Sequence, residues 1–128
     1  MRKNARWLAA AAIAASAVLA FAQKPSATRR IPQLENDQVR VWKSIILPNQ
    51  PLSLHRHDHP RVIVALKGGR LKVVKESGEE RSIDWETGKA YWLGADPPNE
   101  RHGDLNEGPE PMEVMVVELL KAAPEGRR

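Results

Sequence analysis

The sequence predicts a small all-β domain made of antiparallel strands. Short apolar runs rich in Val, Ile and Leu recur after the N-terminal region, and within several of them apolar and polar positions alternate. Gly, Pro and Asn clusters interrupt these runs at nearly regular intervals, as turns between short strands do. A chain of 128 residues has room for one domain, and about seven or eight strands of this kind favour a small sandwich or barrel.

Each expected strand has its own apolar run. In chain order we expect strands at residues 34–47, 52–57, 61–67, 70–76, 81–85, 90–93, 101–106 and 112–120. Gly68 and Gly69 have the sequence of a two-residue hairpin between the third and fourth of these strands. Turn residues at 48–51, 76–79, 87–88 and 107–111 separate most of the others.

The first 22 residues have the three parts of a secretory signal peptide. Residues 1–6 carry three positive charges, residues 7–21 are alanine-rich and almost wholly apolar, and residues 20–22 form an A-x-A cleavage site. A membrane anchor is the alternative, but such an apolar run forms about 22 Å of helix, short of a hydrocarbon core of roughly 30 Å. We therefore expect a periplasmic or secreted protein that begins at Gln23 after cleavage.

The residues on either side of the expected domain are polar. Residues 23–33 lack periodicity and are expected to form a flexible leader, residues 34–121 the β-barrel domain, and residues 122–128 a polar tail. The strand at 112–120 alternates regularly and is expected to be a core and edge strand. An exposed edge of that kind could also support a homodimer.

Charge and cysteine content narrow the class of partner. The chain has 20 Lys+Arg and 16 Asp+Glu, and removal of the three basic residues in the signal peptide leaves 17 against 16. A nearly neutral domain gives no electrostatic reason to expect nucleic acid or an anionic membrane as partner. The chain has no cysteine, so the exported domain is expected to fold without disulfides.

Three of the four histidines are spaced two apart in the segment "LHRHDHPR". Side chains alternate along an extended strand, so His55 and His57 project from one face and could share a metal ion. His59 has the same parity, but Pro60 is expected to turn the chain beside it. His102 is on a different expected strand, which a closed barrel can bring close. Histidines on a half-buried strand are also often packing residues, so this pattern alone leaves both interpretations open.

The two histidine-bearing segments resemble the two sequence motifs of the cupin family. The first motif has a glycine, five intervening residues, H-x-H, three or four intervening residues, a glutamate, six intervening residues and a second glycine. Here His55 and His57 are followed at those offsets by Arg61 and Gly68. The second motif ends in Pro-x-Gly-x-x-His-x-x-x-Asn, and four residues fall at its offsets: Pro97, Asn99, His102 and Asn106. The resemblance covers residues 39–120.

Three residues depart from the family's pattern. Asn49 and Asn99 stand where the motifs have glycine, and asparagine is the next best residue for a left-handed backbone. Arg61 stands where the first motif has its glutamate ligand, and a guanidinium group cannot bind a metal. The resemblance therefore implies a metal site without its usual carboxylate.

The resemblance implies a jelly-roll β-barrel that holds one divalent metal near its mouth through His55, His57 and His102. Three neutral imidazoles leave open coordination positions and suit Fe, Zn, Ni, Cu or Mn. Thiol dioxygenases of this superfamily are similar in using three histidines without the glutamate. His59 could instead complete a four-histidine shell, which favours structural or storage binding.

Arg61 has three candidate orientations. Pointed at the metal, it would lower metal affinity by repulsion between like charges. Pointed past the metal, it could hold the carboxylate of a small anionic ligand with two hydrogen bonds. It could also reach solvent or pair with Asp58, as exposed charged residues often do.

Other residues are weaker candidates for contacting a small ligand. They are Tyr91, Trp92, Asp104 and Asn106. Alternation along a strand places one of the two neighbouring aromatic residues inside the barrel and the other outside. Asp104 could accept a hydrogen bond from a histidine N–H or be a plain turn-proximal acid.

The sequence leaves several functional classes open. One is a cupin that binds a metal and a small, anionic ligand without turnover, and another is a metal-dependent oxygenase or isomerase. A third is a metal-free ligand-binding barrel. Fold alone does not choose among them, and no general base stands out, although His59 and Asp104 are candidates.

Overall fold

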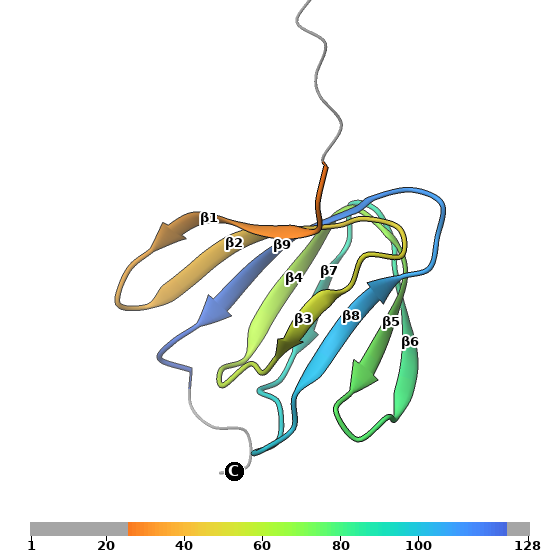
Figure 1. Cartoon of the computed structure of the whole chain (residues 1–128). Helices are drawn as coiled ribbons and strands as arrows, with labels where there is room; N and C mark the ends of the chain where they lie inside the picture. The colour runs from red at the N-terminus through yellow and green to blue at the C-terminus, as the bar shows by residue number, and fades with distance from the viewer. Residues whose placement is uncertain (1–25, 123–128) are drawn as a thin grey trace, which may run out of the picture.

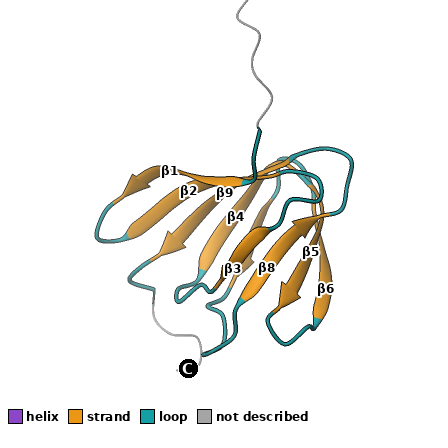
Figure 2. Ribbon diagram, in the orientation of Figure 1, coloured by secondary structure: helices purple, strands orange, loops and turns teal. Residues whose placement is uncertain are grey.

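The computed structural model describes residues 26–122. The regular secondary structure within that range consists of β-strands (Figure 2). The strands are β1 (Arg29–Glu35), β2 (Val39–Ile46), β3 (Leu52–His55), β4 (Arg61–Lys67), β5 (Gly69–Lys75), β6 (Glu80–Trp85), β7 (Ala90–Leu93), β8 (His102–Asn106) and β9 (Met112–Leu119). The prediction of an all-β domain is confirmed. Within residues 26–122, no helix has the length and apolar character needed to cross a bilayer.

The strands form two antiparallel sheets (Figure 1). One sheet has the strand order β1-β2-β9-β4-β7 and the other has the order β3-β8-β5-β6. Strands that are adjacent in a sheet are mostly distant in sequence, as in a jelly roll. The chain therefore passes repeatedly from one sheet to the other, and the turns between sheets decide which side chains meet.

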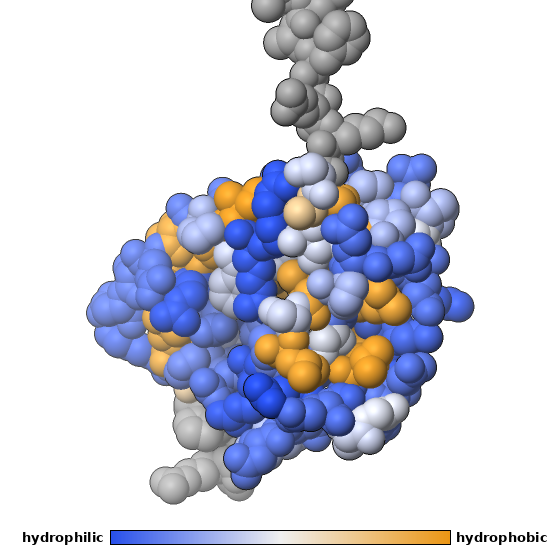
Figure 3. Space-filling view, in the orientation of Figure 1, coloured by the Kyte–Doolittle hydropathy of each residue, from blue (hydrophilic) through white to orange (hydrophobic). Residues whose placement is uncertain are grey.

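The core fills the space between the sheets. Its buried members are Trp42, Ile46, Ile63, Ala65, Leu71, Val73, Trp85, Met112, Val114 and Val116. On β9 every second side chain is buried, and this inward-facing series ends with Glu118. An acid therefore occupies a core-facing position at one end of the barrel. The face shown in Figure 3 is mostly hydrophilic, with apolar areas of limited size.

Gly68 and Gly69 do not form the predicted hairpin. β4 pairs with β7 and β9, whereas β5 pairs with β6 and β8, so the chain changes sheet between β4 and β5. A Cβ atom on Gly68 would lie 2.0 Å from the carbonyl oxygen of Trp85. The position needs glycine because two backbone segments pass against each other there. The glycines mark a bend, but between sheets rather than between paired strands.

The structure also corrects two predictions about the ends of the domain. Residues 29–33, expected in a flexible leader, belong to β1, which pairs with β2 from Arg29 opposite Ile45. Most side chains of β1 are exposed, so its sequence lacks alternation, and backbone hydrogen bonds place it. β9 is not an edge strand, because β2 and β4 flank it. Residues 1–25 and 123–128 are outside the described range, with the predicted signal peptide and most of the polar tail.

Asn49 and Asn99 have the backbone conformation that the sequence predicts. Their φ angles are 57° and 60°, and in residues 26–122 they are the only non-glycine residues with positive φ. Asparagine tolerates this left-handed region better than most residues. The two replacements for motif glycines therefore keep the local backbone shape.

Candidate metal centre

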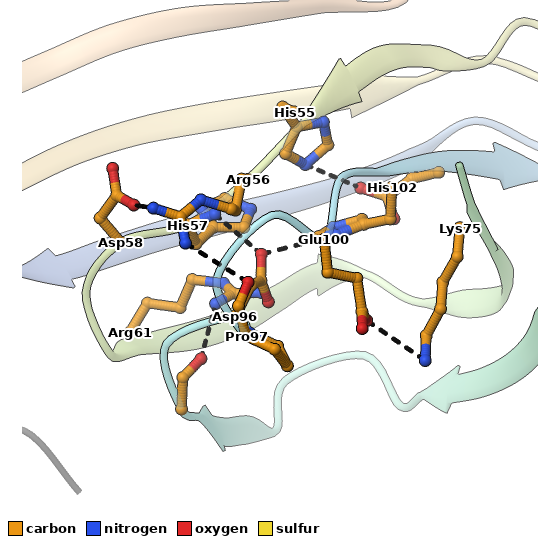
Figure 4. Close-up of polar contacts among 12 residues, drawn as sticks. His55, Arg56, His57, Asp58, Arg61, Lys75, Asp96, Pro97, Glu100 and His102 are labelled. Atoms are coloured by element: carbon orange, nitrogen blue, oxygen red, sulfur yellow. Dashed lines mark hydrogen bonds and ion pairs between the residues drawn. The ribbon is translucent and has the colours of Figure 1, made fainter. Parts of the chain in front are cut away.

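Three histidines converge at the end of the barrel where β3 and β9 end and β4 and β8 begin. His55 is the last residue of β3 and lies directly opposite His102, the first residue of β8. His57 follows two residues after β3 (Figure 4). One ring nitrogen from each of the three lies within 4.8 Å of the other two, so they could hold one metal ion.

Asp96 fixes the position of His57, which lies beyond the end of its strand. The backbone N–H of His57 donates to Asp96 Oδ2 at 2.8 Å, and the backbone N–H of Asp96 donates to the His57 carbonyl at 2.8 Å. Strand alternation therefore places His55 but not His57, which depends on the loop between β7 and β8. The sequence interpretation missed Asp96 because this loop has no periodic pattern.

Each of the three imidazoles has its Nδ1 atom near an oxygen. His55 Nδ1 lies 2.7 Å from the carbonyl oxygen of Ser53, which can only accept, so Nδ1 carries the proton and Nε2 keeps a lone pair. His102 Nδ1 lies 3.5 Å from Asp96 Oδ2, and His57 Nδ1 lies 3.8 Å from Glu118 Oε2. His55 Nε2 is buried without a hydrogen-bond partner.

This arrangement is the one expected of metal-binding histidines. Imidazole ligands commonly direct their second nitrogen to a carbonyl or carboxylate, which fixes the tautomer and the ring orientation. A buried nitrogen with no partner is unfavourable unless something binds it. A divalent cation fits the lone pair of His55 Nε2.

Burial keeps two of the histidines neutral. Burial and, secondarily, the positive charge of Arg61 lower the pKa of His57 to about 2. Burial also lowers the pKa of His55. Metal binding requires neutral imidazole, so both side chains are in the ligand form at neutral pH.

Several solved structures are similar to this chain. A cupin domain from Bordetella pertussis has a TM-score of 0.66 and 21% identity, over 78% of this chain and 99% of its own. A protein with a double-stranded β-helix domain from Klebsiella pneumoniae has a TM-score of 0.56 and 23% identity, over 79% of this chain and 84% of its own. A cupin superfamily protein from Desulfitobacterium hafniense has a TM-score of 0.56 and 10% identity, with the same coverages.

The chain has the cupin fold. No protein-family model and no curated protein matches the sequence. The likeness is therefore one of three-dimensional structure, and it confirms the jelly-roll prediction.

Arg61, at the position of the cupin glutamate, is buried beside the centre and does not reach solvent. Its side chain is 7% exposed, Nη1 donates to the carbonyl oxygen of Gly94 at 2.9 Å, and Nη2 lies 3.6 Å from Asp96 Oδ1. Asp58 pairs with Arg56 instead. Of the three orientations considered for Arg61, the one towards solvent or Asp58 is therefore wrong. Burial lowers the pKa of Arg61, and Asp96 is the first of the acids that oppose this effect.

Two neighbouring cavities lie beside the histidines and share His57 as a lining residue. A small cavity of about 40 Å³ is lined by His55, His57 and His102 together with Arg61 and Asp104. A second cavity of about 500 Å³ lies between the β1–β2 hairpin and the segment that follows β3. Three residues line both cavities: Arg30, Trp42 and His57. A molecule in the larger cavity would therefore touch the side chain of one candidate ligand.

The structure places His59 outside the group of three histidines. His59 lines only the larger of the two cavities, and the group whose nitrogens approach one another consists of His55, His57 and His102. Buried Pro60 follows it and turns the chain into β4. The described residues therefore form a three-histidine centre and not a four-histidine shell.

Three other predicted ligand contacts do not line either cavity. Tyr91 packs against the core and accepts a hydrogen bond from the Glu86 backbone N–H at 2.8 Å, whereas Trp92 is on the outside of β7. Alternation along the strand is confirmed, but it does not bring either ring to the centre. Asn106 is buried and donates to the carbonyl oxygens of Ile46 and Glu110. Its role is to hold the turn before β9.

Glu118 is a site residue that the sequence interpretation missed, although the sequence contains a signal for it. It shares the parity of the buried residues Met112, Val114 and Val116 on β9. An acid on the inward face of an otherwise apolar strand indicates a buried polar partner. Here Glu118 Oε1 lies 3.6 Å from Arg40 Nη1, and Oε2 lies 3.8 Å from His57 Nδ1.

Proposed function

We propose that the protein is an exported cupin that binds one divalent metal ion through the Nε2 atoms of His55, His57 and His102. The observation that carries this proposal is the buried Nε2 of His55, which has no hydrogen-bond partner while its Nδ1 is held by Ser53. Oxygens near the Nδ1 atoms of the other two rings support the same orientation. Such a donor set suits Fe, Zn, Ni, Cu or Mn.

A small anionic molecule is the proposed second ligand. Arginines outnumber acids around the small cavity, where Arg30, Arg61 and Arg81 are opposed by Asp104. A divalent ion would add two further positive charges, so an anion is favoured there. The adjoining 500 Å³ cavity has the volume of a small-molecule site. An organic anion in that cavity could reach the metal beside His57.

Metal uptake tests the first part of this function. Protein stripped with a chelator and offered Fe(II), Mn, Ni, Cu or Zn is expected to bind one equivalent, measured by elemental analysis after gel filtration. His55→Ala, His57→Ala and His102→Ala are each expected to lose most of the bound metal. His59→Ala is the matched control and should keep it, because His59 faces only the larger cavity. A wild type that takes up none of these ions would overturn the proposal.

Turnover is a separate question with its own measurement. Three protein nitrogens leave coordination positions open for a substrate or dioxygen. The loaded protein is therefore to be screened for dioxygen consumption with small organic acids. Dioxygen consumption would identify an oxygenase, and metal binding without it would leave a binding protein or an isomerase.

A further inference from the structure

We propose that Asp104 is a fourth ligand of this metal, so that a carboxylate from β8 replaces the glutamate that is absent at position 61. The proposal rests on the proposed function, because it assumes that the three histidines bind a metal. It assigns to Asp104 a direct bond to the ion, in place of a contact with substrate or with a histidine N–H. The centre would then have three imidazoles and one carboxylate.

The fold places Asp104 inside the centre. It follows His102 by two positions on β8, so the two side chains project from the same face of the strand. Its side chain is 13% exposed and lines the small cavity with the three histidines. Oδ2 lies 3.6 Å from His55 Nε2, and Oδ1 lies 3.8 Å from His102 Nε2.

Three acids lie near the histidines: Asp96, Asp104 and Glu118. They differ in which ring nitrogen they face. Asp96 and Glu118 lie beside Nδ1 atoms, as acids that orient a histidine do. Asp104 lies beside the Nε2 atoms of two different histidines. Since Nε2 is the nitrogen that is free to bind the ion, Asp104 is on the metal side of both rings.

The distances are compatible with shared ligation, and it is the ring nitrogen that each acid faces, rather than the length of the contact, that separates Asp104 from Asp96 and Glu118. Both separations exceed the upper limit of about 3.2 Å for an N–H···O bond. Two ligand atoms on one ion, each about 2.1 Å from it, lie about 3.0–3.4 Å apart in octahedral or tetrahedral geometry. A small movement of the Asp104 carboxylate towards His55 and His102 would meet that requirement.

Charge gives an independent reason for an acid at this place. Arg61 introduces a positive charge where cupins have an anionic ligand, and Arg30 and Arg81 line the same cavity. Three neutral imidazoles would cancel neither charge of an ion that lies beside these guanidinium groups. A bound Asp104 carboxylate reduces this repulsion.

The absence of cysteine makes a direct test possible. The chain has no cysteine, so a thiolate introduced at position 104 would be its only thiolate. Asp104→Cys loaded with Co(II) is expected to show the near-ultraviolet sulfur-to-cobalt charge-transfer absorption that follows from a metal–thiolate bond. His59→Cys is the matched control and should load with Co(II) without that absorption. Far-ultraviolet circular dichroism checks that each variant keeps the β-fold.

The isosteric variant Asp104→Asn gives a second measurement. It is expected to bind Co(II) about 10- to 100-fold more weakly than wild type and to show altered visible bands when saturated. A Co(II)-loaded Asp104→Cys protein without charge-transfer absorption, or an Asp104→Asn protein with the wild-type visible spectrum, would overturn the proposal. Failure of the wild type to bind Co(II) would instead overturn the proposed function, which is metal binding by the three histidines.

Discussion

At the scale of single residues, the centre depends on charged side chains that are almost wholly removed from water. Arg61 is held by the Gly94 carbonyl and lies next to Asp96, which in turn holds the backbone of His57. A buried cation in this position is stabilised by its partners, and its removal leaves Asp96 without a cation. Arg61 therefore supports the position of a ligand as well as the charge of the site.

Replacement of Arg61 tests this structural role. Arg61→Met is expected to lower the free energy of unfolding of the metal-free protein by about 3 kcal/mol, because one partner of a buried charged pair is lost. Urea unfolding followed by circular dichroism measures the change. Arg70→Met is the control: the Arg70–Asp84 pair is exposed on both sides, so its loss should cost less than about 1 kcal/mol. Equal effects of the two substitutions would contradict the prediction.

The lowered pKa of His57 predicts how the stability of the metal-free protein depends on pH. Its pKa is about 2 in the folded protein and about 6.5 in an unfolded chain, so the unfolded state binds more protons below pH 6.5. Stability therefore falls as the pH is lowered through that range, and His57 alone contributes a loss of about 2 kcal/mol between pH 6.5 and pH 5. Urea unfolding of metal-free protein at pH 7, 6 and 5 measures it. In His57→Gln, the free energy of unfolding should depend less steeply on pH. A dependence as steep as that of the wild type would show that His57 is not its source.

Only part of the centre could be predicted from the sequence. Motif spacing identified His55, His57 and His102, which the structure brings together. The orientation of Arg61 could not be predicted, because it depends on Gly94 and Asp96 in a loop without periodicity. Glu118 was predictable in principle from its inward-facing position on β9.

At the scale of elements, the alternation of apolar residues reveals a strand but not its partners. It marks β4, β5 and β9, whose inward faces are buried. It does not mark β1, whose side chains are mostly exposed. It also gives no sign that β4 and β5 belong to different sheets, since this depends on contacts between residues far apart in sequence.

Gly68 offers a test of the change of sheet. Gly68→Ala is expected to lower the free energy of unfolding by about 3 kcal/mol or more, because its Cβ would collide with the Trp85 carbonyl. Thermal unfolding measures the change. Gly88→Ala is the control: Gly88 has a φ of 84° but no atom within 4 Å of an added Cβ, so about 1 kcal/mol is expected. A fully stable Gly68→Ala protein would show that the close approach is unimportant.

At the scale of the whole molecule, the sequence predicts export and the fold limits how two copies could associate. β9 is paired on both sides, so a homodimer formed through strand pairing would have to use β1 or β7 of one sheet, or β3 or β6 of the other. The predicted homodimer stays a prediction. Its interface is now expected at one of the edge strands rather than at β9.

Export has a simple measurement. Protein produced from residues 1–128 is expected to begin at Gln23, because a charged segment, an apolar run and an A-x-A site precede that residue. Intact mass of the protein from the periplasmic or culture fraction tests the cleavage position. A membrane-bound species that retains residues 1–22 would show that the segment is an anchor.

The pairing of His55 with His102 has a consequence for how the protein would acquire the proposed metal ion. These residues are 47 positions apart in the chain and meet only when β3 and β8 pair, which makes completion of the centre a non-local step in folding. Before that step, the short histidine run around His57 would act as a weak chelator. The ions present where and when folding is completed therefore influence which metal is captured, besides the intrinsic affinity order of divalent metals.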